Sequence, residues 1–292
     1  MQKLLLFGIA GFIAQLVDGS LGMGYGLTSS TMLIALGITP AVASASIHFA
    51  EIATTAASGT AHYRFGNVDV ALLKRMVLPG AIGAFVGALF LGSISGDLIK
   101  PFVSAFLLLL GVYVTASVLF GLRNKREKKL LSHWKTVPLS IVAGFFDSVG
   151  GGGWGPIATP TLMAHTAMSP RRVVGTVDAS EFAVTLAGSA GFLLVLGLHG
   201  INWSWVAIFA ASGLVAAPIA AALVRYLPAR VLAAIVGGAI ILTNARTVLG
   251  LLSVDPAIVS SLLLGGLVLW VALVVFVVRQ HRRTATVTAA AG

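Results

Sequence analysis

Aspartates stand beside glycine-rich stretches at two places in an otherwise apolar chain. Asp147 lies in the run FFDSVGGGGWGP at 145–156, and Asp18 lies in the sparser run LVDGSLGMGYG at 16–26. Each glycine inside a helix costs about 1 kcal/mol relative to alanine, so four in succession break a helix. A broken helix leaves backbone N–H groups free to bind an anion, and a nearby carboxylate can cap those groups or carry a proton.

Four more ionisable residues recur with one spacing inside apolar segments. His48 and Glu51 lie three residues apart, and Asp178 and Glu181 repeat that spacing, which places each pair on one helix face. Ionisable groups inside a membrane span are costly and mark a pathway, a relay or a paired partner. Two interpretations stay open. Either Glu51 and Glu181 exchange protons, because burial favours the neutral form of a carboxylic acid, or the residues form structural pairs, with His48 as the partner of Glu51.

The composition indicates the medium in which these residues act. Hydrophobic residues make up 58% of the chain and charged residues 10%, with a mean hydropathy of +0.99, whereas soluble domains carry about 25% charged residues. The sequence therefore predicts an all-α integral membrane protein. The chain has no cysteine, which excludes disulfides and thiolate ligands, and its acids and histidines show no metal-ligand spacing. We predict no metal, no cofactor and no catalytic residue.

Apolar segments need about 20 residues to cross a bilayer as a helix. Seven such spans are predicted, at 40–62, 76–93, 98–120, 173–198, 203–224, 230–252 and 257–278. The glycines interrupt segments 4–38 and 136–168, leaving arms of about 14 or 15 residues that reach only ~21 Å of a ~30 Å hydrocarbon core. Each of these segments is predicted to be a glycine-broken helical hairpin, either re-entrant or made of two short full crossings.

The two halves of the chain repeat each other. In order, the matched residues are Asp18 and Asp147, Gly22 and Gly151, Gly24 and Gly153, Tyr25 and Trp154, Gly26 and Gly155, Pro40 and Pro170, His48 and Asp178, and Glu51 and Glu181. We therefore predict two repeats, each with one hairpin and three membrane-spanning helices, and one extra C-terminal helix. The predicted boundaries are 1–122 for the first repeat, 123–135 for a basic loop, 136–252 for the second repeat, 253–278 for the extra helix and 279–292 for a basic tail.

Positive charges predict how the repeats lie in the membrane, because Lys and Arg concentrate on cytoplasmic loops. The basic segments are 62–75, 121–135, 169–172, 225–230 and 279–283, whereas 199–202 and 253–256 carry no Lys or Arg. Segment 136–168 lies between the basic segments 121–135 and 169–172, which are both predicted to be cytoplasmic. This hairpin must therefore begin and end on the same side of the membrane. The first repeat then starts outside and the second inside, an inverted topology that is typical of secondary transporters with broken helices. The net charge of +10 is a topology signal rather than a nucleic-acid-binding surface.

The repeated pattern also carries a family resemblance. It comprises an aspartate, a glycine-rich break, a helix that begins with proline and an acidic residue within that helix. The two copies are GFIAQLVDGSLGMGYGLTSSTMLIALGITPAVASASIHFAEI and GFFDSVGGGGWGPIATPTLMAHTAMSPRRVVGTVDASEFAVT. The chain thereby resembles the TauE/SafE sulfite exporter family, also called the toluene sulfonate uptake permease family. The resemblance implies a multi-pass protein of the cell inner membrane that transports sulfite, sulfoacetate or another organosulfonate, and it leaves a homodimer open.

The glycine tips are the candidate substrate site, because N–H groups at helix N-termini bind oxyanions and glycine lets the backbone approach closely. The candidate substrate-binding residues are Gly22, Gly24, Tyr25, Gly26, Thr28, Gly151, Gly152, Gly153, Trp154, Gly155 and Thr159. The candidate coupling or pathway residues are Asp18, His48, Glu51, Asp147, Asp178 and Glu181. The structural alternatives are that the glycines are packing surfaces between helices and that the two hairpin aspartates are helix caps.

Other functions fit the residues less well. An intramembrane enzyme acting on lipid phosphate needs clustered Lys or Arg at its site, and neither hairpin contains one. A nucleotide-driven pump needs a phosphate-binding loop of the form GxxxxGK[ST], which is absent. An anion channel stays open as an alternative. Arg246 lies deep enough in 230–252 to attract an anion, or it extends to the outer interface.

Single cysteines introduced at positions 125 and 201 test the predicted topology. Position 125 lies in the basic loop 121–135 and position 201 in the uncharged loop 199–202, so we expect a membrane-impermeant thiol reagent to label 201 from outside and to spare 125. The cysteine-free parent is the control for background labelling. Labelling of 125 with protection of 201 would reverse the assignment.

Overall fold

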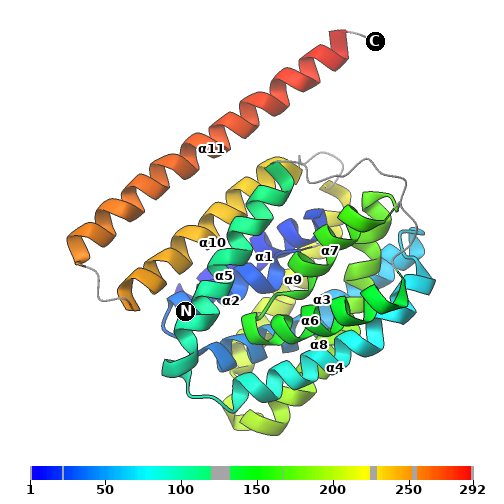
Figure 1. Cartoon of the computed structure of the whole chain (residues 1–292), viewed down its shortest axis with the longest axis vertical. Helices are drawn as coiled ribbons and strands as arrows, with labels where there is room; N and C mark the ends of the chain where they lie inside the picture. Colours follow the sequence, from blue (N-terminus) through cyan, green and yellow to red (C-terminus); the bar gives the residue numbers. More distant parts are fainter. Residues whose placement is uncertain are drawn as a thin grey trace.

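A computed structural model describes residues 2–21, 23–119, 132–166, 168–223, 229–251 and 255–290. These residues form eleven α-helices and one short 3-10 helix, and none of them lies in a β-strand. The helices are α1 (Gln2–Leu21), α2 (Tyr25–Ala35), α3 (Pro40–Arg64), α4 (Val70–Gly92), α5 (Gly96–Leu119), α6 (His133–Gly150), α7 (Trp154–His165), α8 (Pro170–Leu196), α9 (Trp203–Leu223), α10 (Ala229–Leu251) and α11 (Pro256–Ala290), with η1 at Leu198–Gly200 (Figure 1). The predicted all-α fold is confirmed.

Local sequence explains where the helices begin. Pro40 and Pro170 stand in the first turns of α3 and α8, where a missing N–H group costs nothing and the fixed φ suits the helix. Asp69 caps α4, because its carboxylate accepts the Leu72 N–H at 3.0 Å. The cap places the start of α4 at Val70 rather than at the predicted 76. The glycines end α1 and α6 early and leave the short helices α2 and α7, of 11 and 12 residues.

The helices pair in a regular pattern. Helix α4 packs against α6 and α8, α1 packs against α9, α3 packs against α8 and α9, and α5 packs against α10. The pattern is unchanged when each helix of α1–α5 is exchanged with the helix at the same place in α6–α10. The pair α4–α6 then becomes α9–α1, and the pair α4–α8 becomes α9–α3. The pairs α3–α8 and α5–α10 stay the same. Two copies of one unit would pack in this way. Their opposite orientation across the bilayer stays a prediction.

Glycines bring α4 and α6 into close contact. A Cβ atom at Gly83 would overlap the carbonyl oxygen of Ile141, and one at Gly144 would overlap the carbonyl oxygen of Gly80. Lipid tails are as apolar as leucine, so helices in a membrane associate through close packing of small residues rather than through the hydrophobic effect. Backbone-to-backbone contact therefore holds this helix pair together.

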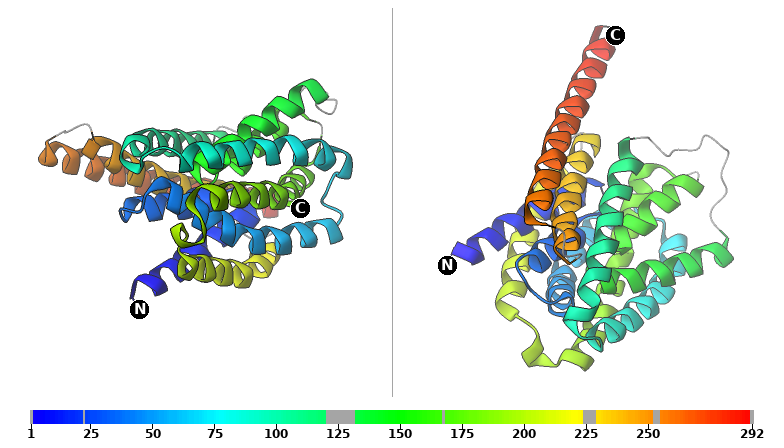
Figure 2. Two further views of the ribbon diagram at one scale, coloured as in Figure 1. Left: turned by 90° about the horizontal axis from the view of Figure 1, so that it is seen from below. Right: turned by 60° about the vertical axis from the view of Figure 1, so that its left-hand side comes forward.

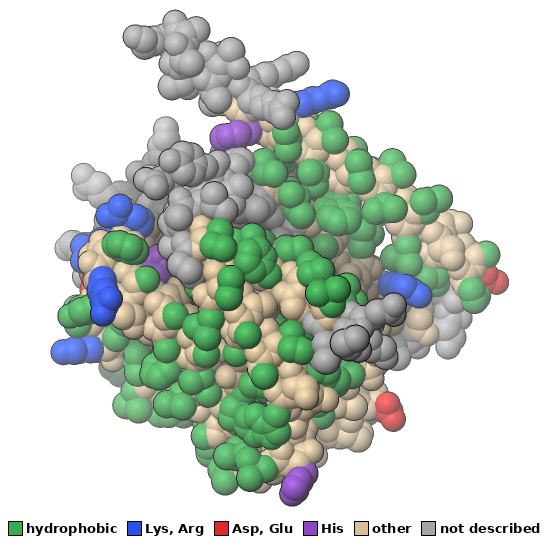
Figure 3. All heavy atoms as spheres, turned by 180° about the vertical axis from the view of Figure 1, so that it is seen from behind, with side chains coloured by type: hydrophobic (Ala, Val, Ile, Leu, Met, Phe, Trp, Pro, Cys, Tyr) green, Lys and Arg blue, Asp and Glu red, His purple; other side chains and the backbone are tan. Residues whose placement is uncertain are grey.

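The outer surface suits a bilayer. Among the described residues, four helical segments are long and apolar enough to cross a membrane: Val70–Gly92, Gly96–Tyr113, Arg171–Leu196 and Pro256–His281. Hydrophobic side chains are spread across the face in Figure 3, and the Lys and Arg side chains drawn there lie toward its left, upper and right sides. Helix α11 packs along α10 (Figure 2), and most of its described apolar side chains are exposed. The protein is thus a multi-pass membrane protein.

Substitution of Gly83 by leucine tests the close packing of α4 on α6. The added side chain has to displace backbone atoms of Ile141, and overpacking of this kind costs roughly 1–3 kcal/mol or more. We expect a lower thermal unfolding temperature in detergent and less folded protein on size-exclusion chromatography. Gly265→Leu is the matched control, because a Cβ atom at this glycine of α11 meets open space. Equal stability of the two variants would contradict the contact.

Candidate functional site

Two chain breaks create the candidate site. Gly24 precedes α2 with φ of 130°, and Gly151 follows α6 in the left-handed conformation with φ of 68°. Residues with a Cβ atom rarely adopt these angles. The glycine pattern read from the sequence therefore corresponds to two tight reversals, one in each hairpin.

An aspartate holds each break in place. The Asp147 carboxylate accepts the backbone N–H of Trp154 at 2.8 Å, and the Asp18 carboxylate accepts that of Tyr25 at 3.4 Å. Both contacts span seven residues and satisfy the first N–H group of a half-helix. Both aspartates thus make the contact expected of a helix cap, and the two copies of the motif form the same turn.

The tips of the two hairpins touch. A Cβ atom at Gly26 would lie 2.5 Å from the Gly151 carbonyl oxygen and 2.8 Å from the Gly152 Cα atom. A Cβ atom at Gly152 would in turn overlap the backbone of Gly26 and Leu27. Both positions thus require glycine for close approach, and the half-helices α2 and α7 begin beside the same contact.

Hydroxyl groups from the first half of the chain satisfy carbonyl groups at the end of α6. Ser44 donates to the Ser148 carbonyl at 2.6 Å, and Ser30 donates to the Gly151 carbonyl at 2.8 Å. The last carbonyl groups of a helix lack intrahelical partners, and a bilayer supplies no water to them. The sequence analysis missed both serines, although Ser44 stands one helical turn before His48.

Two aromatic residues anchor the half-helices. The Tyr25 hydroxyl donates to the Phe209 carbonyl at 2.8 Å, and the Trp154 indole donates to the Val177 carbonyl at 3.1 Å. Both side chains are buried, and the Trp154 ring lies against Gly80 of α4. Each ring therefore fixes the first turn of its half-helix to a longer helix, α9 or α8.

His48 forms a buried ion pair with Asp147. Its Nε2 atom lies 3.3 Å from Asp147 Oδ2, and both side chains are fully buried. The sequence-based interpretation of His48 as the partner of Glu51 was therefore wrong, because the imidazole reaches across to the second hairpin instead. Spacing along one helix favoured Glu51, and a contact between α3 and α6 carries no sequence signal of that kind.

The groups around the two ring nitrogens of His48 are hydrogen-bond acceptors. Nδ1 lies 3.0 Å from the Ser44 carbonyl, which can only accept, so Nδ1 carries hydrogen. Nε2 lies 3.3 Å from the Ser148 hydroxyl, whose own hydrogen is donated to the Ala84 carbonyl at 2.7 Å. Nε2 therefore faces acceptors on Ser148 and Asp147. The imidazole therefore stands between acceptors on α3 and on α6, with Asp147 Oδ2 at 3.3 Å.

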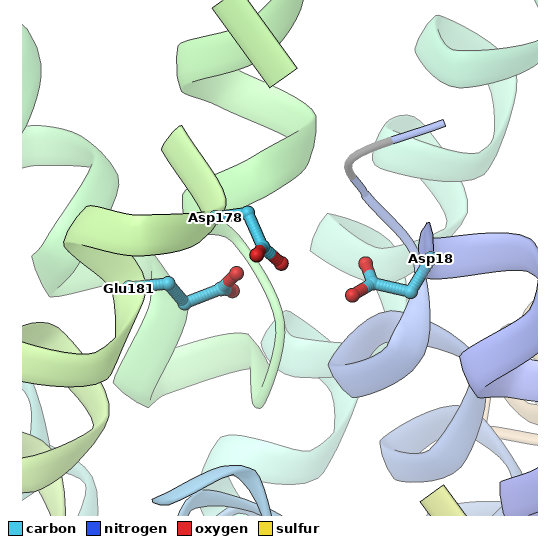
Figure 4. Close-up of side chains that lie close together, drawn as sticks. All are labelled: Asp18, Asp178 and Glu181. Carbon is cyan, nitrogen blue, oxygen red and sulfur yellow. The ribbon is translucent and has the colours of Figure 1, made fainter. Parts of the chain in front are cut away.

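Three further carboxyl groups lie close together, and no described Lys, Arg or His forms an ion pair with them. Oxygens of Asp18, Asp178 and Glu181 all lie within 4.8 Å of one another, and all three residues are buried. Figure 4 shows the side chains pointing toward one another from α1 and α8. The sequence analysis found no metal-ligand spacing because these acids come from different halves of the chain. As a group, they are the described residues best placed to hold a cation.

Glu51 lies at the contact between the tips. A Cβ atom at Gly26 would lie 2.7 Å from Glu51 Oε1, while Glu51 Oε2 is buried without a hydrogen-bond partner among the described residues. Within the part of the chain that the structure describes, Lys, Arg and His form no ion pair with Glu51, Asp18, Asp178 or Glu181. The site therefore contains several buried carboxyl groups and one imidazole, which pairs with Asp147.

The remaining predicted site residues lie along the half-helices. Thr28 Oγ1 is buried without a hydrogen-bond partner among the described residues, whereas the buried Thr159 has one. Gly153 precedes α7, and a Cβ atom at this position would overlap the backbone of Phe146 and Asp147 in α6. Gly155 is buried in the first turn of α7. Gly22 lies outside the described residues.

Arg246 lies at a separate cavity. This cavity has a volume of about 600 Å³ and brings Arg246 together with Lys100 of α5. Its other lining residues are Ile34, Ala35, Leu242, Thr243, Thr247, Gly250, Leu263 and Leu267. Two cations, two hydroxyl groups and apolar walls suit an anion with an apolar part. The sequence analysis singled out Arg246 by its depth in the span, but Lys100 gave no such signal.

Comparison with known proteins gives a consistent result. The family model described as "Sulfite exporter TauE/SafE" matches residues 7–247. The chain is 49% identical over 282 residues to the probable membrane transporter protein YtnM of Bacillus subtilis, covering 96% of this chain and 94% of the relative. It is 28% identical over 199 residues to the probable membrane transporter protein YdhB of the same organism, covering 66% and 78%. No solved structure gives a significant match.

Removal of the imidazole at position 48 tests the buried ion pair. His48→Ala leaves the Asp147 carboxyl group buried without its partner, and breaking such a pair costs roughly 3–5 kcal/mol. We expect a large fall in unfolding temperature for His48→Ala. In a double-mutant cycle, the combined His48→Ala and Asp147→Ala variant should lose less stability than the sum of the single variants. Additive losses would show that the two residues do not interact.

Proposed function

Since the chain belongs to the TauE/SafE sulfite exporter family and its relatives are named membrane transporters, we propose that it is a secondary transporter of a sulfur-containing anion. The proposed substrates are sulfite, sulfoacetate and other organosulfonates. Transport proceeds by alternating access in the cell inner membrane, and the C-terminus is cytoplasmic. The anion is held near the midplane at the N-termini of α2 and α7 and moves together with protons.

The observation that carries the anion site is the meeting of the two tips at Gly26 and Gly152. Two half-helices begin there, and each N-terminus offers the positive end of a helix dipole and unpaired N–H groups. The aspartates already accept the N–H groups of Tyr25 and Trp154. Amides of the first helical turns, such as those of Leu27 and Gly155, are therefore the proposed donors to the anion.

Hydroxyl groups extend the proposed anion site. Thr28 lies one turn into α2, and its buried Oγ1 atom has no partner among the described residues. A buried hydroxyl group without a partner costs free energy. An oxyanion that accepts from this hydroxyl would recover that cost, so Thr28 supports the proposal independently of the glycines.

The neighbouring acids explain why the anion should not travel alone. Glu51 lies against Gly26, and two like charges about 5 Å apart repel by about 3 kcal/mol at an effective dielectric constant of 20. An anion at the tips is therefore stable only when the acids around it are neutralised. Protonation of Glu51 and Glu181 would supply that neutralisation, which couples anion binding to proton binding.

The packing also suits alternating access. The contact at Gly26 and Gly152 and the pair of His48 with Asp147 both join the first half of the chain to the second. If one half rocks against the other about the pair of His48 with Asp147, the contact at Gly26 and Gly152 changes. The proposed site would then open alternately to the two sides of the membrane, as in other transporters with inverted repeats.

Uptake into proteoliposomes tests the proposed function. We expect accumulation of at least one of sulfite, thiosulfate and sulfoacetate, and weaker or no accumulation of sulfate. An imposed pH gradient should increase that accumulation. Liposomes without protein are the control. Uptake of none of these anions under any gradient would refute the proposed substrate class, and rates far above those of carriers would favour a channel.

Replacement of Thr28 by valine tests the proposed anion site. The change removes the unpartnered hydroxyl group and keeps the shape of the side chain, so we expect affinity for the transported anion to fall about fivefold, the equivalent of one ordinary hydrogen bond of about 1 kcal/mol. Thr60→Val is the matched control, because Thr60 is exposed on α3 and donates to the Ala56 carbonyl. Unchanged affinity in folded Thr28→Val protein would place the anion elsewhere.

A further inference from the structure

Position 48 in the first half of the chain corresponds to position 178 in the second. His48 and Glu51 match Asp178 and Glu181, each at an offset of 130 residues. The pairs share their spacing and lie on equivalent helices, α3 and α8. A basic side chain in one copy therefore stands where the other copy has an acid.

The structure places these residues in equivalent contacts. In one contact, His48 of α3 meets Asp147 of the second hairpin at 3.3 Å. In the other, Asp178 of α8 meets Asp18 of the first hairpin, with their oxygens within 4.8 Å and Glu181 beside them (Figure 4). The two aspartates also cap their half-helices in the same way. The first contact contains a basic side chain of the protein, and the second contains acids alone.

We propose that the cluster of Asp18, Asp178 and Glu181 binds the coupling cation of the transporter, H⁺ or Na⁺. The cation takes the place that the His48 imidazole occupies in the equivalent contact. Binding of the cation follows from the cluster alone, whereas its role in coupling rests on the function proposed above. Coupling of cation movement to anion movement would then occur at one contact, that of Asp18 on α1 with Asp178 and Glu181 on α8.

A carboxylate oxygen of Asp178 that lacks a hydrogen-bond partner in the described part of the chain supports a bound cation in the cluster. Asp178 Oδ2 is buried and has no hydrogen-bond partner among the described residues, and the carboxyl group points toward Asp18 and Glu181 (Figure 4). Taking a carboxylate out of water without a partner costs several kcal/mol. The Ser58 hydroxyl of α3 is a hydrogen-bonding neighbour of Asp178 and adds one further oxygen to the cluster. A cation between the carboxyl groups removes the unpaired charge.

The surroundings of the cluster favour a monovalent cation. The other ionisable groups of the packed helices near it are Tyr25, His48, Glu51 and Asp147. His48 is engaged by Asp147, so it does not neutralise the cluster. Calcium takes six to eight oxygen ligands, more than three carboxyl groups and one hydroxyl group provide as single ligands. A proton or a sodium ion carries a single positive charge, the most that one imidazole can supply in the equivalent contact.

The difference between the two contacts would make one permanent and the other conditional. The imidazole cannot leave, so α3 stays joined to the second hairpin through His48 and Asp147. A bound cation can leave, so α8 is joined to the first hairpin only while Asp18 and Asp178 share it. Loss of the cation restores repulsion between these acids and separates α1 from α8. The cation would thereby control one side of the interface between the two halves.

The variant Asp178→His tests the proposal, because it gives the second copy the side chain of the first. The measurement is thermal unfolding of the full-length protein in detergent, without anion, in NaCl or in choline chloride at pH 6, 7.5 and 9. We expect the wild type to unfold about 5 °C or more higher with its cation. Stabilisation by NaCl identifies Na⁺, and stabilisation only by lower pH identifies H⁺. Asp178→His should lose the dependence on Na⁺. Because the introduced imidazole itself titrates in this pH range, the dependence on pH is tested with Asp18→Asn and Glu181→Gln, which add no titrating group.

Further variants keep the test decisive. Asp18→Asn and Glu181→Gln should also weaken the cation dependence, and they replace Asp178→His if that variant does not fold. Asp97→His is the matched control, because Asp97 is exposed in the first turn of α5. Wild-type cation dependence in the folded cluster variants would overturn the proposal. Stabilisation by Ca²⁺ or Mg²⁺, but by neither Na⁺ nor lower pH, would also overturn it.

Transport separates this proposal from the function on which it rests. With the anion identified in the uptake panel, Asp178→His should retain exchange of labelled for unlabelled anion and lose accumulation driven by the cation gradient. Gradient-driven accumulation at the wild-type level would overturn the coupling role. If the wild type carries no sulfur anion, the proposed substrate fails, while cation-dependent stability that disappears in Asp178→His still supports the cation site.

Discussion

A bilayer offers no water to a broken helix, and this constraint governs the whole arrangement. Every chain break inside the hydrocarbon region leaves N–H and carbonyl groups that must find partners within the protein. Here the aspartates accept N–H groups beyond each break, and Ser30 and Ser44 donate to carbonyl groups at the end of α6. The donors come from the first half of the chain and the carbonyl groups from the second. The break after α6 therefore takes part of its hydrogen bonding from the first half of the chain.

The same assembly concentrates charge. Placing the second hairpin beside α3 brings Asp147 to His48, and placing the first hairpin beside α8 brings Asp18 to Asp178 and Glu181. Asp147 has a basic partner within the protein, the His48 imidazole. We propose that the cluster of Asp18, Asp178 and Glu181 instead takes a bound cation as its partner. Structural support and transport chemistry thus involve the same carboxyl groups, so capping and coupling are not competing roles for the hairpin aspartates.

Sequence patterns predicted the elements better than their contacts. Glycine runs, proline positions and apolar length predicted an all-α membrane protein, and the structure has two hairpins, each followed by three helices, and an additional C-terminal helix. The motif residues also identified the family. The predicted partner of His48 was wrong because it was based only on spacing along one helix. That spacing favoured Glu51, whereas the imidazole lies beside Asp147. The clustering of Asp18 with Asp178 depends on how α1 and α8 pack, and a single sequence contains no measure of that packing.

The contact between the hairpin tips has a kinetic consequence. Gly26 and Gly152 meet through backbone atoms alone, so no side chains interlock there, unlike the knobs and holes of ordinary helix packing. Separation of the tips would require no rotamer change at either glycine, and the described hydrogen bond that joins the tip regions directly is the one from Ser30 to the Gly151 carbonyl. If the two halves move against each other as proposed, the tips could therefore part without side chains having to disengage at these glycines.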